Sequence, residues 1–352
     1  MRAVSLKEGK LALREVATPE PGPGQILVRT LACAICASDH HYMDHPEVSA
    51  SDQSGMRVHA PHDDVVMGHE YCGEVVAYGP DTQQEWPVGT HVTSPPALIG
   101  AGGMRIIGMA PDAPGGFGEF FLLNEYLARS VPNELPAERI ALNDAMAVGW
   151  FYTRLGVEQS PTGSVPLVIG LGAIGQTVVA GLKARGSGPI VAADFSASRR
   201  ALARQMGADV VVDPAATSPW AAWREAAWGS PDDVHDRIAL RGRPGQVVYE
   251  MVGRNGVLGD IVDNCQINAR ILSCGGAAED TIHTTVAHMK HLNIQIGGDL
   301  IEDWYDCLDR VVSGELDPMP LMGETVTLEQ LPDAIERARL ATSPVRIVYS
   351  AR

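Results

Sequence analysis

The middle of the chain alternates short apolar segments with helical ones, and this alternation constrains the fold more than any other feature. Five apolar segments have the length and composition of buried strands; they lie at 166–170, 189–194, 209–213, 246–253 and 269–276. Stretches of helical periodicity at 173–186 and 196–207 separate the first three. Nearly continuous apolar strands joined by helices predict a parallel sheet covered on both faces. We therefore expect an α/β protein with a doubly wound parallel sheet.

The turn after the first of these strands has the sequence GLGAIG. Its glycines have the spacing of a dinucleotide-binding loop, in which they permit a tight turn, close approach to a pyrophosphate and helix-to-strand packing. FAD or a nucleoside methyl donor would use a similar loop, but the loop follows a β-rich region in mid-chain, which favours a nicotinamide cofactor. The loop residues expected to contact it are Gly170, Gly172, Ala173, Ile174 and Gly175.

Asp194 ends the next strand, about twenty residues on, where a carboxylate would bond the adenosine ribose hydroxyls. A carboxylate there repels a ribose phosphate, so the sequence predicts NAD rather than NADP. Arg199 and Arg200 follow closely and allow two interpretations. Arg199 would contact the cofactor, or both arginines are solvated residues of a first helical turn.

Composition limits the possible partners. The formal net charge of -16 argues against nucleic acid or an anionic membrane as the main partner. The N-terminus lacks the apolar segment of a signal peptide, and the uncharged run 159–182 is broken by glycine and proline, as in a soluble strand and helix. Six scattered cysteines are typical of reduced thiols, so we expect a cytoplasmic protein of about two domains with a small-molecule substrate.

Metal-binding residue types gather in the first 150 residues. Cys36 lies in CAICASDHH, His69 and Glu70 in GHEYCGEVV, and Asp144 in an otherwise apolar stretch before the glycine loop. Catalytic zinc needs about three such ligands and one open position. Each residue alone has an ordinary explanation, as a core cysteine, a hydrogen-bonded histidine or a helix cap. The pair Cys33 and Cys36 also permits a redox role, although a redox motif should open a helix in a small βαβ domain.

Together these segments resemble the zinc-dependent medium-chain alcohol dehydrogenases over nearly the whole chain. The similarity lies in ICASDHH, GHEYCGEVV, the segment 115–136, GLGAIG with its acidic partner, and the segment 312–338. The resemblance implies a GroES-like β-rich catalytic domain at 1–149, an NAD-binding Rossmann domain at 150–297, and a C-terminal segment at 298–352 that completes the first domain. It further implies a homodimer or homotetramer.

The resemblance also assigns roles near the metal. Cys36, His69 and Asp144 would bind one catalytic zinc, and Glu70 would approach it during ligand exchange. Asp39 would orient His69 through its other ring nitrogen. An aspartate as the third ligand resembles the branch that acts on secondary alcohols.

Three further residues receive roles from the same resemblance. Ser38 would contact the alcohol hydroxyl and begin a proton relay, and His41 would be its outer base. Arg346 resembles an arginine that contacts the pyrophosphate. The expected activity is the interconversion of an alcohol, preferably secondary, and its carbonyl compound by hydride transfer with NAD. A zinc-free enone or quinone reductase and a non-catalytic dinucleotide-binding protein are the alternatives.

The sequence departs from the family in three places. Many relatives bind a second, structural zinc through four cysteines, but the corresponding segment 92–116 has none, so we expect one zinc per chain. Ala37 stands where some relatives have an arginine that reaches the pyrophosphate. The loop 42–64 is longer than expected and contains His45, His59 and His62. We expect these to be solvated residues rather than a second metal site, and the loop to shape the substrate entrance.

Overall fold

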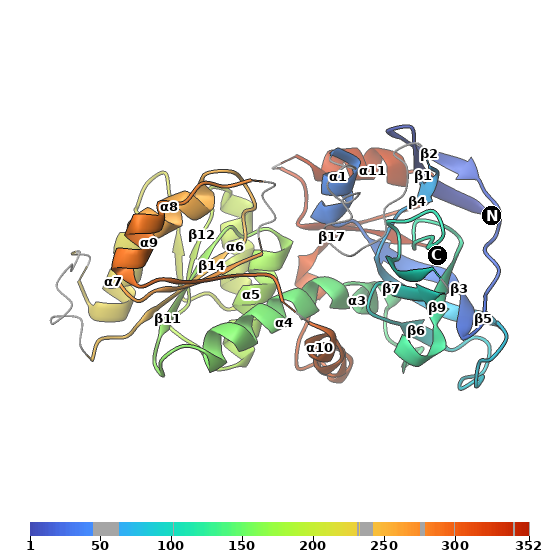
Figure 1. The fold of residues 1–352 in the computed structure, drawn as a ribbon, viewed down its shortest axis with the longest axis horizontal. Coiled ribbons are helices and arrows are strands. Elements are labelled where there is room, and N and C mark those ends of the chain that lie inside the picture. Colours follow the sequence, from blue (N-terminus) through green and yellow to red (C-terminus); the bar gives the residue numbers. More distant parts are fainter. Residues whose placement is uncertain are drawn as a thin grey trace. The chain divides into compact units, whose positions relative to one another are not determined.

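The computed structural model describes residues 1–44, 63–100, 102–230, 232, 242–274, 279–298, 300–340 and 342–351. The chain forms two compact units, labelled by element in Figure 1. Unit 1 comprises Met1–Asp144 and Leu308–Arg352, and unit 2 comprises Ala145–Cys307. The sequence placed these borders at 149/150 and 297/298. The structure has them inside two continuous helices, α4 (Asn143–Glu158) and α10 (Ile301–Ser313), where no linker marks the change of unit.

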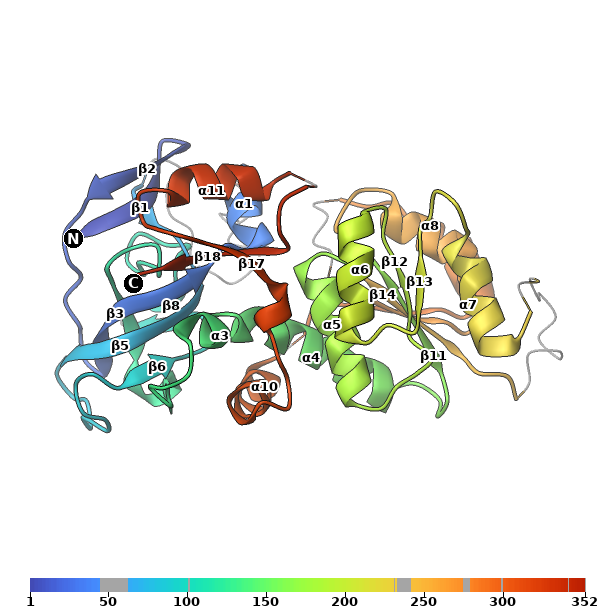
Figure 2. The ribbon, with the colours of Figure 1, turned by 180° about the vertical axis from the view of Figure 1, so that it is seen from behind.

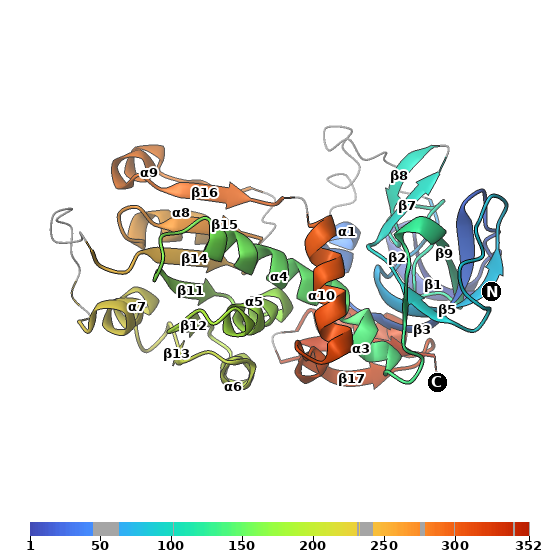
Figure 3. The same cartoon turned by 90° about the horizontal axis from the view of Figure 1, so that it is seen from below.

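Unit 2 is built around a parallel sheet of order β13-β12-β11-β14-β15-β16, and Figure 3 shows the strands in this order. The strands are β11 (Val165–Ile169), β12 (Val191–Ala193), β13 (Val210–Val212), β14 (Gln246–Glu250), β15 (Arg270–Ser273) and β16 (Asn293–Ile296). The first five confirm the sequence prediction. The helices of this unit are α5 (Ala173–Ala184), α6 (Ala197–Met206), α7 (Pro219–Trp228), α8 (Val257–Asn264) and α9 (Thr284–Lys290).

The strand order of unit 2 reverses beside β11. From β11 the chain proceeds outward to β12 and β13, and then returns to β14 on the opposite side of β11. In open parallel sheets, ligands bind at the carboxyl ends of the strands where the order reverses. The glycine-rich turn that follows β11 lies at this position.

Local sequence explains where the helices of unit 2 begin and end. The Ser196 hydroxyl accepts from the backbone N–H of Arg199 at the start of α6, and Ser218 does the same for Ala221 at the start of α7. Such side-chain oxygens satisfy backbone donors that have no partner within the helix. Gly207 ends α6 in the left-handed conformation, with φ of 116°, which glycine adopts at little cost.

Unit 1 is mostly β-structure. Its main sheet has the order β10-β6-β5-β3-β18-β17, with β9 also paired to β3, and a smaller sheet has the order β2-β1-β4. The main-sheet strands are β3 (Gln25–Ala34), β5 (Glu70–Tyr78), β6 (His91–Thr93), β9 (Phe120–Asn124), β10 (Arg129–Val131), β17 (Met322–Val326) and β18 (Arg346–Ser350). The smaller sheet has β1 (Arg2–Lys7), β2 (Lys10–Glu15) and β4 (Val65–Val66). As the sequence predicted, the C-terminal segment completes this unit.

Short helices complete unit 1. They are α1 (Ala37–Asp44), α3 (Ala137–Ala141) and α11 (Leu331–Ala338), with 3-10 turns η2 (Glu125–Leu127) and η3 (Met319–Leu321). Helices α1 and α11 lie side by side in Figures 1 and 2. His40 Nε2 contacts the Ile335 carbonyl oxygen at 2.7 Å, and Arg339 forms a two-bond ion pair with Asp44. These contacts attach α1 to the C-terminal part of the chain.

The cysteine-free segment 92–116 contains two strands, β7 (Ala97–Gly100) and β8 (Gly103–Ile106), which pair antiparallel as a hairpin. Asn124 holds it from the end of β9: its Oδ1 accepts from the Ile99 N–H at 2.7 Å, and its Nδ2 donates to the Ile99 carbonyl at 2.9 Å. Leu98 and Ile107 are buried in the adjoining core. Hydrogen bonds and apolar packing therefore stabilise this hairpin.

Across the part of the chain that the structure describes, no helix combines the length and apolar character needed to cross a membrane. Most of the predicted loop 42–64, including His45, His59 and His62, lies outside the described residues, whereas its first three residues belong to α1 and not to a loop.

Candidate functional site

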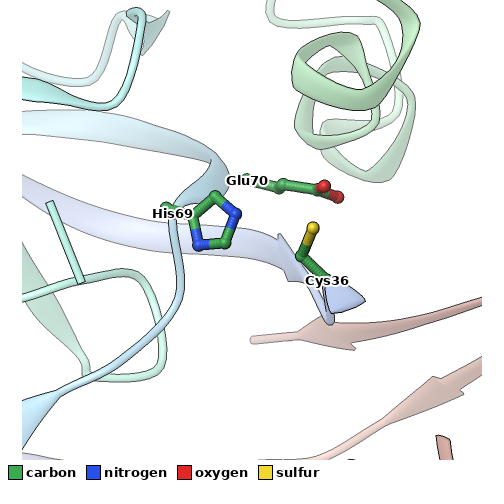
Figure 4. Close-up of side chains that lie close together, drawn as sticks. All are labelled: Cys36, His69 and Glu70. Atoms are coloured by element: carbon green, nitrogen blue, oxygen red, sulfur yellow. The ribbon is translucent and has the colours of Figure 1, made fainter. Parts of the chain in front are cut away.

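Three metal-binding side chains meet in unit 1 (Figure 4): Cys36, His69 and Glu70. Cys36 follows the end of β3, and His69 and Glu70 lie at the start of β5. The two strands pair antiparallel with Ala34 opposite Glu70, so the end of one strand lies beside the start of the other. A ligand atom from each side chain lies within 4.8 Å of the other two, in the one such group found among the described residues.

The donor set fits a zinc ion. Thiolate sulfur, imidazole nitrogen and carboxylate oxygen are the ligand types that zinc prefers, at distances of about 2.0–2.3 Å. Glu70 Oε1 accepts from Arg346 at 2.7 Å, whereas the buried Glu70 Oε2 has no hydrogen-bond partner in the described part of the chain. A buried carboxylate oxygen without a partner is costly, and a bound cation would satisfy it.

Electrostatics favour the metal-binding form of Cys36. Burial by itself would raise the pKa of this thiol, but the Arg346 guanidinium and the contact with His69 outweigh burial and lower the pKa from 9.0 to about 6. The side chain is therefore mainly a thiolate at neutral pH, and the thiolate is the form that binds metals. Burial also raises the pKa of Glu70 well above its usual value, although Arg346 opposes the shift.

His69 is held between two residues of α1. Its Nδ1 lies 3.2 Å from Asp39 Oδ1, although the two atoms are not aligned for a hydrogen bond, and its Nε2 lies 3.0 Å from Ser38 Oγ. Asp39 Oδ2 accepts the Cys36 N–H at 2.9 Å, which fixes the carboxylate. Burial lowers the pKa of His69, but Asp39 and Cys36 outweigh it and the net pKa is raised well above 6.5. These positions suit the roles expected of Ser38 and Asp39.

Arg346 belongs to the same cluster. It is 4% exposed, its Nη2 donates to Glu70 and lies 3.8 Å from Cys36 Sγ, and its Nη1 donates to the Ile35 carbonyl at 3.2 Å. The sequence assigned this arginine to a pyrophosphate, and that contact stays a prediction. Its ion pair with Glu70 was missed, because the two residues are 276 positions apart and neither has a local pattern that points to the other.

Two predicted residues are not part of this cluster. Asp144 lies half-buried in the first turn of α4 and is not a member of the group that Cys36, His69 and Glu70 form. His41 lies in α1, half-buried, three residues after Ser38. Metal binding by Asp144 and proton relay by His41 therefore remain predictions.

The glycine-rich turn in unit 2 has the geometry that its sequence predicts. Gly170 has a φ of 88°, in the left-handed region that favours glycine. A Cβ at Gly175 would lie 1.9 Å from the Gly170 carbonyl oxygen, so no side chain fits there. Gly172 immediately precedes α5, and Ala173 and Ile174 form its first turn. Backbone N–H groups at such a helix start favour anions.

Asp194 lies beside this turn. Its Oδ2 accepts the Leu171 N–H at 2.8 Å, and its Oδ1 accepts the Ser196 N–H at 2.7 Å. Arg200 pairs with Asp213 at 2.9 Å and donates to the carbonyls of Asp194 and Phe195. Arg199 Nη1 lies 4.0 Å from the Asp194 carboxylate. Arg200 is thus engaged within the fold, and cofactor contacts by Asp194 and Arg199 stay predictions.

Sequence comparisons match both units to described families. Residues 22–133 match the alcohol dehydrogenase GroES-like domain, and residues 173–313 match the zinc-binding dehydrogenase family. The (R,R)-butanediol dehydrogenase of Bacillus subtilis (strain 168) is 30% identical over 270 residues, 73% of this chain and 72% of that enzyme. The L-threonine 3-dehydrogenase of Sinorhizobium medicae (strain WSM419) is 27% identical over 349 residues, 95% of this chain and 93% of that enzyme.

Solved structures share the fold. The crystal structure of 2R,3R-butanediol dehydrogenase from Bacillus subtilis has a TM-score of 0.77 at 23% identity, and the match covers 100% of this chain and 99% of the other. An alcohol dehydrogenase from E. coli CFT073, complexed with NADH, has a TM-score of 0.79 at 21% identity and 99% coverage of both chains.

Proposed function

Because the chain belongs to the zinc-binding medium-chain dehydrogenase superfamily, we propose that it interconverts a secondary alcohol and its ketone with one catalytic zinc and NAD. The observation that carries the proposal is the convergence of Cys36, His69 and Glu70, whose ligand atoms lie within 4.8 Å of one another. The glycine-rich turn with Asp194 supports NAD as the hydride carrier.

Different residues of unit 1 would bind the metal and orient its ligands. Cys36, His69 and Glu70 would hold the metal, with Asp144 as the further acidic candidate from the sequence. When bound, zinc would polarise the substrate oxygen as a Lewis acid, and NAD would accept or return the hydride. Asp39, 3.2 Å from His69 Nδ1, would orient the imidazole toward the bound metal.

Residues of α1 would carry out the proton transfer. The Ser38 hydroxyl lies 3.0 Å from His69 Nε2, and so beside a side chain that would hold the metal. Ser38 would accept the hydroxyl proton of the alcohol and release its own proton outward, and His41, later in the same helix, would take up the released proton and pass it to solvent. A positioned acid or base of this kind contributes about 10²–10⁴-fold to a rate.

The relatives suggest a substrate class. Butanediol and threonine, which the named relatives oxidise, each have a secondary hydroxyl beside a carbon that bears a second polar group. We propose a secondary alcohol of this kind, such as a vicinal diol or a β-hydroxy amino acid. A panel of such compounds and of simple secondary alcohols tests this through NADH formation, with NADP as the control cofactor.

Metal dependence separates this function from its alternatives. Activity that disappears with a chelator and returns with zinc would support the proposal. Turnover of enones by protein that lacks zinc would instead indicate a reductase of the same fold, and NADH binding without any turnover would indicate a non-catalytic protein.

Substitutions identify the ligands. We expect Cys36→Ser to lose zinc, while Cys72→Ser, which changes a buried cysteine of β5 outside the metal group, retains it. Comparing Glu70→Ala with Asp144→Ala in zinc content decides which carboxylate binds. Full zinc content and full activity in Glu70→Ala would contradict the ligand set proposed from the geometry.

A further inference from the structure

Glu250 is a buried carboxylate that has no part in the mechanism above. It is the last residue of β14 and is 3% exposed. Its Oε1 accepts two backbone N–H groups of the turn that follows, from Val252 at 2.8 Å and Gly253 at 2.9 Å. Its Oε2 accepts the Ser273 hydroxyl at 2.7 Å. Three donors on one buried carboxylate make a rigid connection, because hydrogen bonds to a carboxylate are stronger than those between neutral groups.

This carboxylate lies where the strand order of unit 2 reverses. Glu250 is the register partner of Ile169, the last residue of β11, on one side, and of Ser273, the last residue of β15, on the other. The Met251 N–H donates to the Ile169 carbonyl, and the Cys274 N–H donates to the Glu250 carbonyl. Glu250 thus joins the carboxyl ends of three adjacent strands at the edge where parallel sheets bind ligands.

The turn that Glu250 holds also contacts the glycine-rich turn directly. A Cβ added at Gly170 would lie 2.6 Å from Val252 Cγ2 and 2.9 Å from the Met251 carbonyl carbon. The backbone at Gly170 therefore packs against residues 251–252, and a shift of one turn displaces the other. Val252 is 37% exposed, so this turn presents an apolar side chain at the same edge.

We infer that Glu250 is a positioning residue for the coenzyme: its carboxylate fixes turn 251–253, which in turn fixes the backbone of the glycine-rich loop. The inference rests on the proposed use of NAD. Glu250 itself is not expected to contact the coenzyme. Loss of the carboxylate should loosen the loop and weaken coenzyme binding, while the metal group of unit 1, with its separate ligands, keeps its zinc.

The test compares two matched carboxylates. Glu125 in unit 1 is also buried and also accepts two backbone N–H groups, from Gln83 and Glu85. Glu250→Ala and Glu125→Ala each remove a buried carboxylate that accepts two backbone N–H groups. Glu125→Ala therefore controls for a general loss of stability. We expect Glu250→Ala to raise the NADH dissociation constant about tenfold, measured by fluorescence titration, and Glu125→Ala to change it less than about twofold.

Two conservative variants complete the series. Glu250→Gln should bind NADH nearly as the wild type does, because its amide oxygen can accept the same N–H groups and its NH₂ can donate to Ser273. Should Glu250→Ala not fold, Ser273→Ala removes one of the three bonds and is expected to give a smaller loss of affinity in the same direction. Equal NADH affinity in Glu250→Ala and wild type, or an equal loss in Glu125→Ala, would overturn the inference.

Hydrogen exchange provides a readout that needs no coenzyme. In the free protein, amides of residues 169–173 and 251–253 should exchange faster in Glu250→Ala than in wild type, and should be unchanged in Glu125→Ala. If wild-type protein fails to bind NADH, the proposed cofactor is wrong, and the exchange rates still decide whether Glu250 positions the loop. Unchanged exchange at 169–173 would refute that role.

Discussion

The buried ion pair between Arg346 and Glu70 allows a quantitative prediction for Arg346→Met. The two side chains are 4% and 1% exposed, and their charged atoms lie 2.7 Å apart. Methionine preserves much of the apolar length of arginine but leaves the Glu70 carboxylate buried without its cation. Removing one partner of a buried pair costs about 3–5 kcal/mol. For a unit of this size, each kcal/mol shifts Tm by roughly 2–4 °C, so the expected loss is roughly 6–20 °C.

The direction of the pH dependence follows from Glu70. Burial raises the pKa of this carboxyl in the folded protein, and Arg346 is the neighbour that opposes the shift most strongly. A group with a raised folded pKa favours the folded state at low pH, where it is protonated, and destabilises it as pH rises and the group ionises. Without Arg346 the pKa rises further. The loss of Tm in Arg346→Met should therefore be larger at pH 8 than at pH 5.

Thermal unfolding of zinc-free protein, followed by circular dichroism at both pH values, measures these effects. Arg337→Met serves as the control, since its ion pair with Glu324 is exposed and such pairs contribute less than about 1 kcal/mol. The double variant Arg346→Met/Glu70→Gln removes the uncompensated charge and should recover most of the loss. If the Tm of Arg346→Met lies within about 2 °C of the Tm of Arg337→Met, the reasoning is refuted, because roughly 2–4 °C corresponds to only 1 kcal/mol.

Three other substitutions test separate features. Ser38→Ala should lower kcat by about 100-fold while zinc content stays unchanged, and an unaltered kcat would exclude the hydroxyl from proton transfer. Asp194→Ala should lower the ratio of kcat/KM for NAD to that for NADP by about tenfold, because the carboxylate no longer repels a ribose phosphate; a constant ratio would contradict this role. Asn124→Ala should destabilise unit 1 by about 1–3 kcal/mol in urea unfolding, since both polar backbone atoms of Ile99 lose their partners, whereas a wild-type midpoint would show that water replaces them.

Periodicity and turn chemistry predicted most of the secondary structure of unit 2. The strands β11 to β15 are apolar runs bounded by polar or glycine residues, so each stands out in the sequence. The edge strand β16 was missed because Asn293–Ile296 is only partly buried, and a strand at the edge of a sheet needs no continuous apolar run. Its pairing with β15 is a tertiary feature that the local sequence does not encode.

The metal group was predictable in composition but not in detail. Cys36 and His69 stand out as ligand types near glycine-punctuated turns, and the antiparallel register of β3 and β5 brings them together. Sequence spacing could not show that Glu70, rather than Asp144, lies in the group. Nor could it show that Arg346 lowers the pKa of Cys36, because that effect depends on which strand inserts beside β3.

The position of β18 inside the main sheet of unit 1 has a consequence for biogenesis. Glu70 and Arg346 are separated in the sequence by all of unit 2. The ribosome therefore synthesises the whole of unit 2 before the strand that carries Arg346 emerges. Until then β3 lacks one neighbour and the Glu70 carboxylate lacks its counter-charge. In nascent chains unit 2 should thus fold first, and unit 1 should become able to bind its metal only when the last strand is inserted.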